Sequence, residues 1–282
     1  MSAANRIPVV DAHQHFWDPE RADYPWLTEE REAIRRRFGP DDLRPVLAAS
    51  GVDRAIVVEA RSSLDETREL LETAEADRIV AGVIGWVDLT DPQVGTALTE
   101  LRYGRGGEFL VGIRHQVREE PDERWLVRPD VLQGLETLAG VRLVYDLLVT
   151  PRELPGAFEA ARQVPSLTFV VEHMGAPPLD GDDGRWATGM QSLAALPNVH
   201  CKLSGLSAAG PDRLAPFVER LRRWFGDERL IFGSDWPVCL LRCGYEDVIE
   251  TFGRLTADAS PEVRRCILGG NAVQVYGLPA LR

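Results

Sequence analysis

Two stretches, Val9-Val10-Asp11-Ala12-His13-Gln14-His15 and Gly233-Ser234-Asp235-Trp236-Pro237, decide the fold prediction. The first stretch begins apolar and β-branched, which is typical of a strand. Side chains alternate between the two faces of a strand, so His13 and His15 point the same way. Asp235 also follows an apolar run. If the first and last strands are neighbours in a closed barrel, these three groups meet and can bind one metal ion. This arrangement predicts a hydrolytic site rather than a binding module.

Eight apolar, β-branched runs recur along the chain, and segments with helical periodicity separate them. Runs that are nearly continuous rather than alternating are typical of parallel strands covered by helices. The runs are 9–13, 55–59, 80–87, 110–115, 142–147, 168–173, 199–203 and 230–233. The pattern predicts the α/β class and a (β/α)8 TIM barrel, as a single domain over residues 1–282. The alternative is an open doubly wound sheet, but no glycine-rich phosphate fingerprint follows the first run.

The connections carry further signals. Residues 63–71 begin with a capping pattern, and 211–225 place five apolar residues at helical spacing. The longest connection, about 16–51, is rich in aromatic residues. Long loops after barrel strands lie over the active site, so this one is predicted to be a lid or substrate wall. The tail 269–278 is expected to form a last turn and helix that close the barrel.

Composition excludes several classes of protein. The chain has 282 residues, 44% of them hydrophobic, and a net charge of −12. No basic stripe with interleaved aromatics occurs, so no nucleic-acid partner is expected. No signal segment or apolar stretch of about 18 residues occurs, so we expect no membrane association and a cytoplasmic location. The four cysteines form no Cys-x-x-Cys pair, and Cys239 is expected to pack rather than react. The oligomeric state is not readable.

Ionisable and polar residues gather where the predicted strands end. A barrel brings these ends to one face, where catalytic side chains collect. Burying so many such groups without partners would be costly, so they are expected to pair with each other, a metal or a substrate. They are His13, His15, Glu59, Arg61, Trp86, Asp88, Arg114, His115, Asp146, Glu172, His173, Lys202, Ser204 and Asp235.

From the residues alone, His13 and His15 are predicted to bind a metal or substrate, the alternative being a buried core pair. Asp235 is a metal ligand or general base, or else a helix N-cap. His173 is assigned to the site rather than to the core. His200 begins a strand, at the face of the barrel that serves stability, and is expected to be structural.

The predicted substrate-binding residues are less specific. Arg114 and His115 are adjacent, so alternation sends them to opposite faces, and we favour Arg114 for the pocket. The remaining candidates are Glu59 and Asp146, which follow strands, and Trp26 and Trp86, which are either pocket walls or core.

Five ordered blocks resemble a known family over nearly the full chain. They are Val10-Asp11-Ala12-His13-Gln14-His15-Phe16-Trp17-Asp18-Pro19, Gly112-Ile113-Arg114-His115, Glu172-His173-Met174-Gly175, Lys202-Leu203-Ser204-Gly205-Leu206 and Phe232-Gly233-Ser234-Asp235-Trp236-Pro237-Val238. The chain resembles the amidohydrolase superfamily, amidohydrolase 2 type. The resemblance is greatest to its lactonase branch, which contains L-fuconolactonase-like, L-rhamnonolactonase-like and pyrone-dicarboxylate lactonases.

This resemblance implies a metal-assisted lactonase, a hydrolase of carboxylic ester bonds (EC 3.1.1 type). It implies Zn²⁺ on His13, His15 and Asp235, with His173 at the family's sixth-strand histidine. Asp146 stands where a histidine ligand is common, so a single zinc is expected. The branch also contains metal-free members, in which the histidines would donate hydrogen bonds to the carbonyl oxygen.

The predicted reaction opens a sugar-acid lactone, such as an L-fuconolactone or L-rhamnonolactone, by attack of water activated by Asp235. His173 is the second predicted catalytic residue, and the predicted partner is the small-molecule lactone. The alternatives are a metal-dependent decarboxylase of the same superfamily, a phosphoesterase or amidase, and a non-catalytic barrel that binds a sugar acid.

Overall fold

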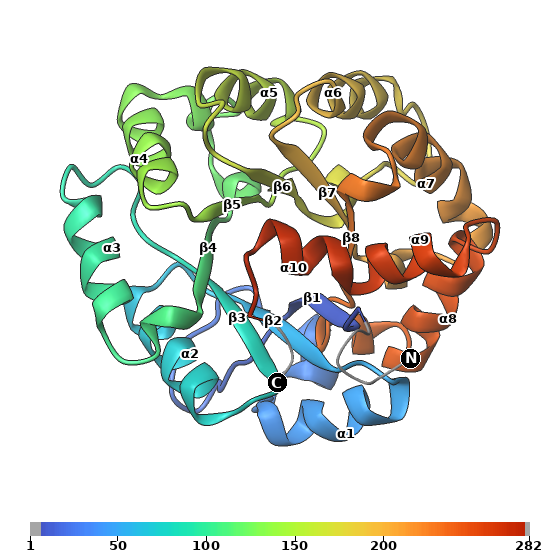
Figure 1. Cartoon of the computed structure of the whole chain (residues 1–282), viewed down its shortest axis with the longest axis horizontal. Coiled ribbons are helices and arrows are strands. Elements are labelled where there is room, and N and C mark those ends of the chain that lie inside the picture. The colour runs from blue at the N-terminus through green and yellow to red at the C-terminus, as the bar shows by residue number, and fades with distance from the viewer. Residues whose placement is uncertain (1–6, 280–282) are drawn as a thin grey trace.

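A computed structural model describes residues 7–279, which form eight parallel strands surrounded by helices (Figure 1). Each strand pairs in parallel with the next one along the chain. The strands are β1 (Val10–Gln14), β2 (Arg54–Val58), β3 (Val80–Gly85), β4 (Leu110–His115), β5 (Val144–Leu147), β6 (Phe169–Val171), β7 (Val199–Leu203) and β8 (Leu230–Phe232). The predicted (β/α)8 barrel is therefore confirmed, and each of the eight predicted runs overlaps one strand.

Most of the helices lie outside the strands, in the ring that Figure 1 shows, whereas the last one lies across one end of the barrel. They are α1 (Pro40–Ser50), α2 (Leu64–Ala76), α3 (Val94–Tyr103), α4 (Pro129–Gly140), α5 (Leu154–Gln163), α6 (Gly184–Ala194), α7 (Pro211–Phe225), α8 (Tyr245–Leu255), α9 (Pro261–Arg265) and α10 (Asn271–Val275). The Ser63 hydroxyl accepts a hydrogen bond from the Glu66 N–H at 3.3 Å, which caps α2 as the sequence predicts. Within residues 7–279, no helix combines the length and apolarity that crossing a membrane requires.

Backbone hydrogen bonds close the barrel between β1 and the segment after β8. The Asp235 N–H donates to the His13 carbonyl and the His15 N–H donates to the Trp236 carbonyl, both at 2.8 Å. Gln14 and Trp236 form a parallel bridge. The first and last strands are neighbours, as predicted, and residues more than two hundred positions apart meet.

The end of the barrel away from His13, His15 and Asp235 is filled by apolar side chains, which we call the barrel floor. The floor comprises Val10, Ala12, Ile56, Val58, Ala81, Ile84, Val111, Val144, Val170, Ile231, Ala272, Tyr276 and Leu278, all of them buried. In Figure 1, α9 and α10 cross the barrel end that faces the viewer. The tail thus closes the barrel, as expected, and contributes three side chains to its interior.

The long first connection is folded rather than extended. It contains a short 3-10 segment, η2 (Glu29–Ile34), and then α1. The Trp17 ring centroid lies 5.0 Å from that of Trp26 and 5.6 Å from that of Phe38, and Phe38 lies 5.3 Å from Trp236. These edge-on contacts attach the connection to the segment after β8, next to Asp235.

Candidate active site

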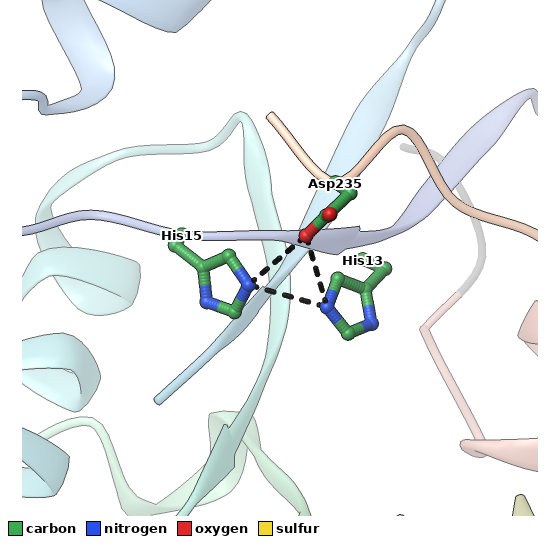
Figure 2. A group of neighbouring side chains, drawn as sticks. All are labelled: His13, His15 and Asp235. Atoms are coloured by element: carbon green, nitrogen blue, oxygen red, sulfur yellow. Dashed lines mark hydrogen bonds and ion pairs between the residues drawn. The ribbon is translucent and has the colours of Figure 1, made fainter. Parts of the chain in front are cut away.

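His13, His15 and Asp235 converge at the mouth of the barrel (Figure 2). The two Nε2 atoms are 3.2 Å apart, and Asp235 Oδ1 lies 3.6 Å from His13 Nε2 and 3.5 Å from His15 Nε2. The register of β1 shifts between Asp11 and Gln14, which marks a bulge at the first histidine. The sequence prediction that these three groups meet is confirmed.

The backbone is left-handed at two site residues, His173 with φ 49° and Asp235 with φ 61°. Residues other than glycine adopt this region at a cost, and such residues cluster at functional sites. At Gly233, an added Cβ would lie 2.5 Å from the His13 Cβ, so only glycine allows the segment after β8 to pack this closely against β1.

The hydrogen bonds of the two histidines fix where their lone pairs point. His15 Nδ1 lies 2.8 Å from the Val58 carbonyl oxygen, which only accepts, so that nitrogen carries the proton. His13 Nδ1 lies 3.2 Å from Glu172 Oε1, which favours a proton there too. Both Nε2 lone pairs then face Asp235 Oδ1. Such a set of two nitrogens and one oxygen fits a cation, and imidazole and carboxylate are ordinary ligands of zinc.

Burial sets the protonation states that this site needs. It lowers the pKa of His13 well below its usual value and also lowers that of His173, so both rings are neutral at pH 7. Burial alone would raise the pKa of Asp235, but the neighbouring imidazoles of His173, His15 and His13 hold it below its usual range. Asp235 is therefore an ionised carboxylate at pH 7, able to accept a proton or bind a cation.

His173 belongs to η6 (Glu172–Gly175), directly after β6. Its Nδ1 lies 2.9 Å from the Ser204 hydroxyl, which also accepts from the His173 N–H at 3.1 Å. Its ring centroid is 4.5 Å from that of His13. Ser204, after β7, therefore orients the third histidine toward the others.

Charged side chains form a buried layer beneath the mouth. Arg114 Nε donates to Glu59 Oε1 at 2.8 Å, and its Nη1 donates to Glu172 Oε2 at 3.0 Å. Lys202 Nζ lies 2.5 Å from Asp146 Oδ2, and burial raises the pKa of Asp146 to about 7 despite this cation. Each of these five side chains is at least 96% buried, so the layer depends on mutual pairing.

A cavity of about 190 Å³ opens beside the three converging groups. His15, His173 and Asp235 line it, together with the predicted Arg114 and Trp26. A larger groove of about 520 Å³ lies between the first connection and α2, but the side chains that line it include none of the site histidines. The chemistry therefore places the site in the smaller cavity.

Four predicted substrate-binding residues are engaged elsewhere. The Trp86 indole N–H donates to His115 Nδ1 at 3.1 Å, and the His115 ring stacks on Trp125 with 4.2 Å between centroids. Glu59 and Asp146 lie in the buried layer. Among the described residues, the cavity lining includes none of these four, so this geometry does not support their contact with substrate.

Sequence reasoning missed other contributors. Arg31 comes from the first connection, where no periodicity marks it, and lines the cavity. Tyr276 lies in the barrel floor, and its hydroxyl donates a hydrogen bond to Asp146 at 3.0 Å. The sequence around Tyr276 predicts only a helix. Asp11 accepts from the Ser234 N–H at 2.9 Å and so holds the segment that carries Asp235. Asp11 lies within the opening stretch, so a buried carboxylate on an apolar strand was the available signal.

The comparisons identify the class of protein. The amidohydrolase family model matches residues 10–278, and the chain belongs to this family. The predicted resemblance is confirmed, down to its lactonase branch.

Two curated relatives, from Burkholderia ambifaria and Burkholderia multivorans, are named L-fucono-1,5-lactonase. The first is 39% identical and covers 95% of this chain and 94% of its own. The second is 38% identical and covers 96% of each chain. A crystal structure of an amidohydrolase from Burkholderia multivorans with bound zinc has a TM-score of 0.90 and 36% identity, over 96% of this chain and 100% of that one.

Proposed function

We propose that this chain hydrolyses a sugar-acid lactone of the L-fuconolactone or L-rhamnonolactone type, using a water activated by Asp235. The observation that carries the proposal is the Asp235 carboxylate, held 3.5–3.6 Å from two histidines at the edge of a cavity. The names of the two curated relatives support the class of substrate.

Asp235 is the general base. Its Oδ1 lies 3.6 Å from His13 Nε2 and 3.5 Å from His15 Nε2. The carboxylate takes a proton from water as the water oxygen bonds to the lactone carbonyl carbon. The ring C–O bond then breaks, and the same proton passes from Asp235 to the leaving alkoxide. The products are a carboxylic acid and a hydroxyl on one chain, and at neutral pH the acid releases its proton to solvent.

His173 and Arg114 stabilise and position the substrate. When it does not bind a metal, the neutral His173 ring can donate a hydrogen bond to the carbonyl oxygen as negative charge develops there. Arg114 uses three of its five N–H groups on Glu59 and Glu172, which leaves two for substrate oxygens. Trp26 presents its ring to the sugar, since its indole N–H is occupied by the Ala60 carbonyl at 2.8 Å.

A single zinc ion would be held by His13, His15 and Asp235, with His173 adjacent to complete the ligand set. Bound there, zinc would act as a Lewis acid that acidifies water or polarises the carbonyl. The lone-pair directions of the two histidines and the charge of Asp235 support this assignment.

The test is hydrolysis of L-fucono-1,5-lactone and a panel of sugar lactones, followed with a pH indicator before and after chelation. We expect acid release that is lost with the metal and restored by zinc. Carbon dioxide release from an aromatic acid would instead support a decarboxylase. Binding of a sugar acid without turnover of any lactone would support a non-catalytic barrel. Full activity without metal would assign the three histidines to hydrogen bonding alone.

A further inference from the structure

His115 ends β4, and both of its ring nitrogens are occupied. Its Nδ1 accepts from the Trp86 indole N–H at 3.1 Å, and its Nε2 lies 2.8 Å from Glu120 Oε1. One face of the ring stacks on Trp125, with 4.2 Å between centroids and an interplanar angle of 10°. A ring held at both nitrogens and on one face offers a substrate no polar atom, so its partners indicate what it does.

Trp86 anchors this ring and fixes its tautomer. The Trp86 backbone N–H donates to the Thr67 hydroxyl of α2 at 2.8 Å, which attaches the residue to a helix. Because an indole N–H only donates, His115 Nδ1 must keep its lone pair toward Trp86. The single N–H of the neutral ring is then at Nε2 and donates to the Glu120 carboxylate.

The contact between His115 and Glu120 closes a short loop, residues 115–120, which we call the β4 loop. The 3-10 segment η4 (Val117–Glu119) makes up most of it, so Arg118 lies in its middle. A side-chain contact that closes so short a loop restricts the backbone of every residue within it. The conformation of the chain at Arg118 therefore depends on the hydrogen bond between His115 and Glu120.

Arg118 is the residue that brings this loop to the barrel mouth. Its N–H donates to the Leu148 carbonyl at 3.1 Å, and both residues line the cavity beside Asp235. Among the residues that the structure describes, no carboxylate pairs with the Arg118 guanidinium. The direction of this long side chain is thus set by the backbone that carries it. A fixed backbone favours binding, because less conformational freedom is lost when a substrate oxygen is bound.

We propose that His115 is a positioning residue, which holds the β4 loop through Glu120 so that Arg118 points at substrate oxygens. The action of Arg118 on a lactone rests on the proposed function. The attachment of the loop to His115 does not, so the two statements can fail separately.

The test is a double-mutant cycle of Glu120→Ala and Arg118→Gln, measured as kcat and KM for the lactone that wild type hydrolyses best. The Glu120 side chain is 27% exposed, so its truncation should leave the fold intact. We expect Glu120→Ala to raise KM about fivefold, with kcat within about twofold. In that background Arg118→Gln should raise KM by less than about twofold more, since the arginine is already misplaced.

Two further variants separate the hydrogen bond from the charge of Glu120. Glu120→Gln removes the charge but keeps an acceptor for His115 Nε2, so its KM should stay within about twofold of wild type. His115→Asn removes the donor and should match Glu120→Ala. Fully additive effects of Glu120→Ala and Arg118→Gln on KM, or a wild-type KM in Glu120→Ala, would overturn the proposal.

Trypsin digestion examines the loop without any reaction. At a temperature where both variants are folded, we expect cleavage after Arg118 to be at least about threefold faster in Glu120→Ala than in Glu120→Gln, with Tm values within about 3 °C. If wild type hydrolyses no lactone, the proposed function fails and this comparison decides. Faster cleavage in Glu120→Ala then supports the attachment of the loop to His115, and equal cleavage contradicts it.

Discussion

The mouth and the floor of this barrel are built by the same eight strands, yet their side chains differ completely. The floor is apolar apart from the Tyr276 hydroxyl, which reaches up to Asp146. The mouth buries two cations and several carboxylates within a few ångströms of the three histidines. In a parallel barrel all strands run the same way, so one end can carry the catalytic residues while the other end stabilises the fold.

The two ends also differ in what they contribute to folding. Burying apolar surface stabilises the fold by about 25 cal/mol per Å². Buried ion pairs roughly break even, because desolvation of the charges offsets their attraction. We therefore expect the floor to stabilise the fold and the mouth to carry out the reaction. The variants described below test this expectation.

The largest expected effect is on turnover, in Asp235→Asn. The amide cannot accept a proton, so kcat for lactone hydrolysis should fall by about 10³-fold. Asparagine tolerates the left-handed backbone of this position, so the Tm should stay within about 3 °C. Indicator assays and thermal unfolding measure the two quantities. Asp258→Asn, at a side chain that is 72% exposed, is the matched control. Turnover within tenfold of wild type would show that another group takes the proton.

The next effect is on stability, in Ile56→Ala. Ile56 is fully buried in the floor, and truncation leaves a cavity that should lower the free energy of unfolding by about 3 kcal/mol. At a temperature where the variant remains folded, kcat should stay within about twofold, since the residue is remote from the mouth. Urea unfolding and the same activity assay test both statements. A large loss of kcat in the folded variant would mean that floor and mouth are coupled.

The division into floor and mouth also separates what the sequence could predict from what it could not. The eight strands were predictable because strands buried on both faces have continuous apolar runs. His13, His15 and Asp235 followed from alternation and barrel closure. His173 was placed in the site, but the predicted strand 168–173 is too long, because the chain leaves β6 at Val171 for a left-handed turn.

The sequence did not predict which side chains contact one another. Alternation favoured Arg114 over His115 for the pocket, and Arg114 lines the cavity, but the pattern could not show that His115 stacks on Trp125, which comes from the connection after β4. Loop residues have no periodicity, so neither this contact nor the entry of Arg31 into the cavity had a signal in the sequence. A pattern gives the face on which a residue lies, whereas its partner depends on three-dimensional packing.

A moderate effect is expected at the rim of the mouth, in Arg118→Gln. Arg118 lines the cavity, and within residues 7–279 its guanidinium forms no hydrogen bond or ion pair, so it is available to substrate oxygens. We expect KM to rise by about five- to tenfold with little change in kcat, which corresponds to about 1 kcal/mol of binding. Arg213→Gln, which removes an exposed pair with Asp180, is the control. Equal falls in kcat and kcat/KM would instead assign Arg118 to the transition state.

The smallest effect concerns His200, which lies at the start of β7, the end of that strand away from the mouth. Burial lowers its pKa to about 4, against about 6.5 in the unfolded chain. The unfolded state therefore binds a proton more readily, so this contribution to stability is complete above pH 6.5 and is lost as the pH falls through 4. In urea unfolding, wild type should lose about 1–2 kcal/mol more than His200→Gln between pH 7 and pH 5, since the side chain is mostly buried. The kcat of the two proteins should keep the same pH profile. A change in the pH profile of kcat would mean that a titrating group near the floor affects catalysis at the mouth. An equal loss of stability in the two proteins on acidification would mean that His200 is already solvated in the folded chain.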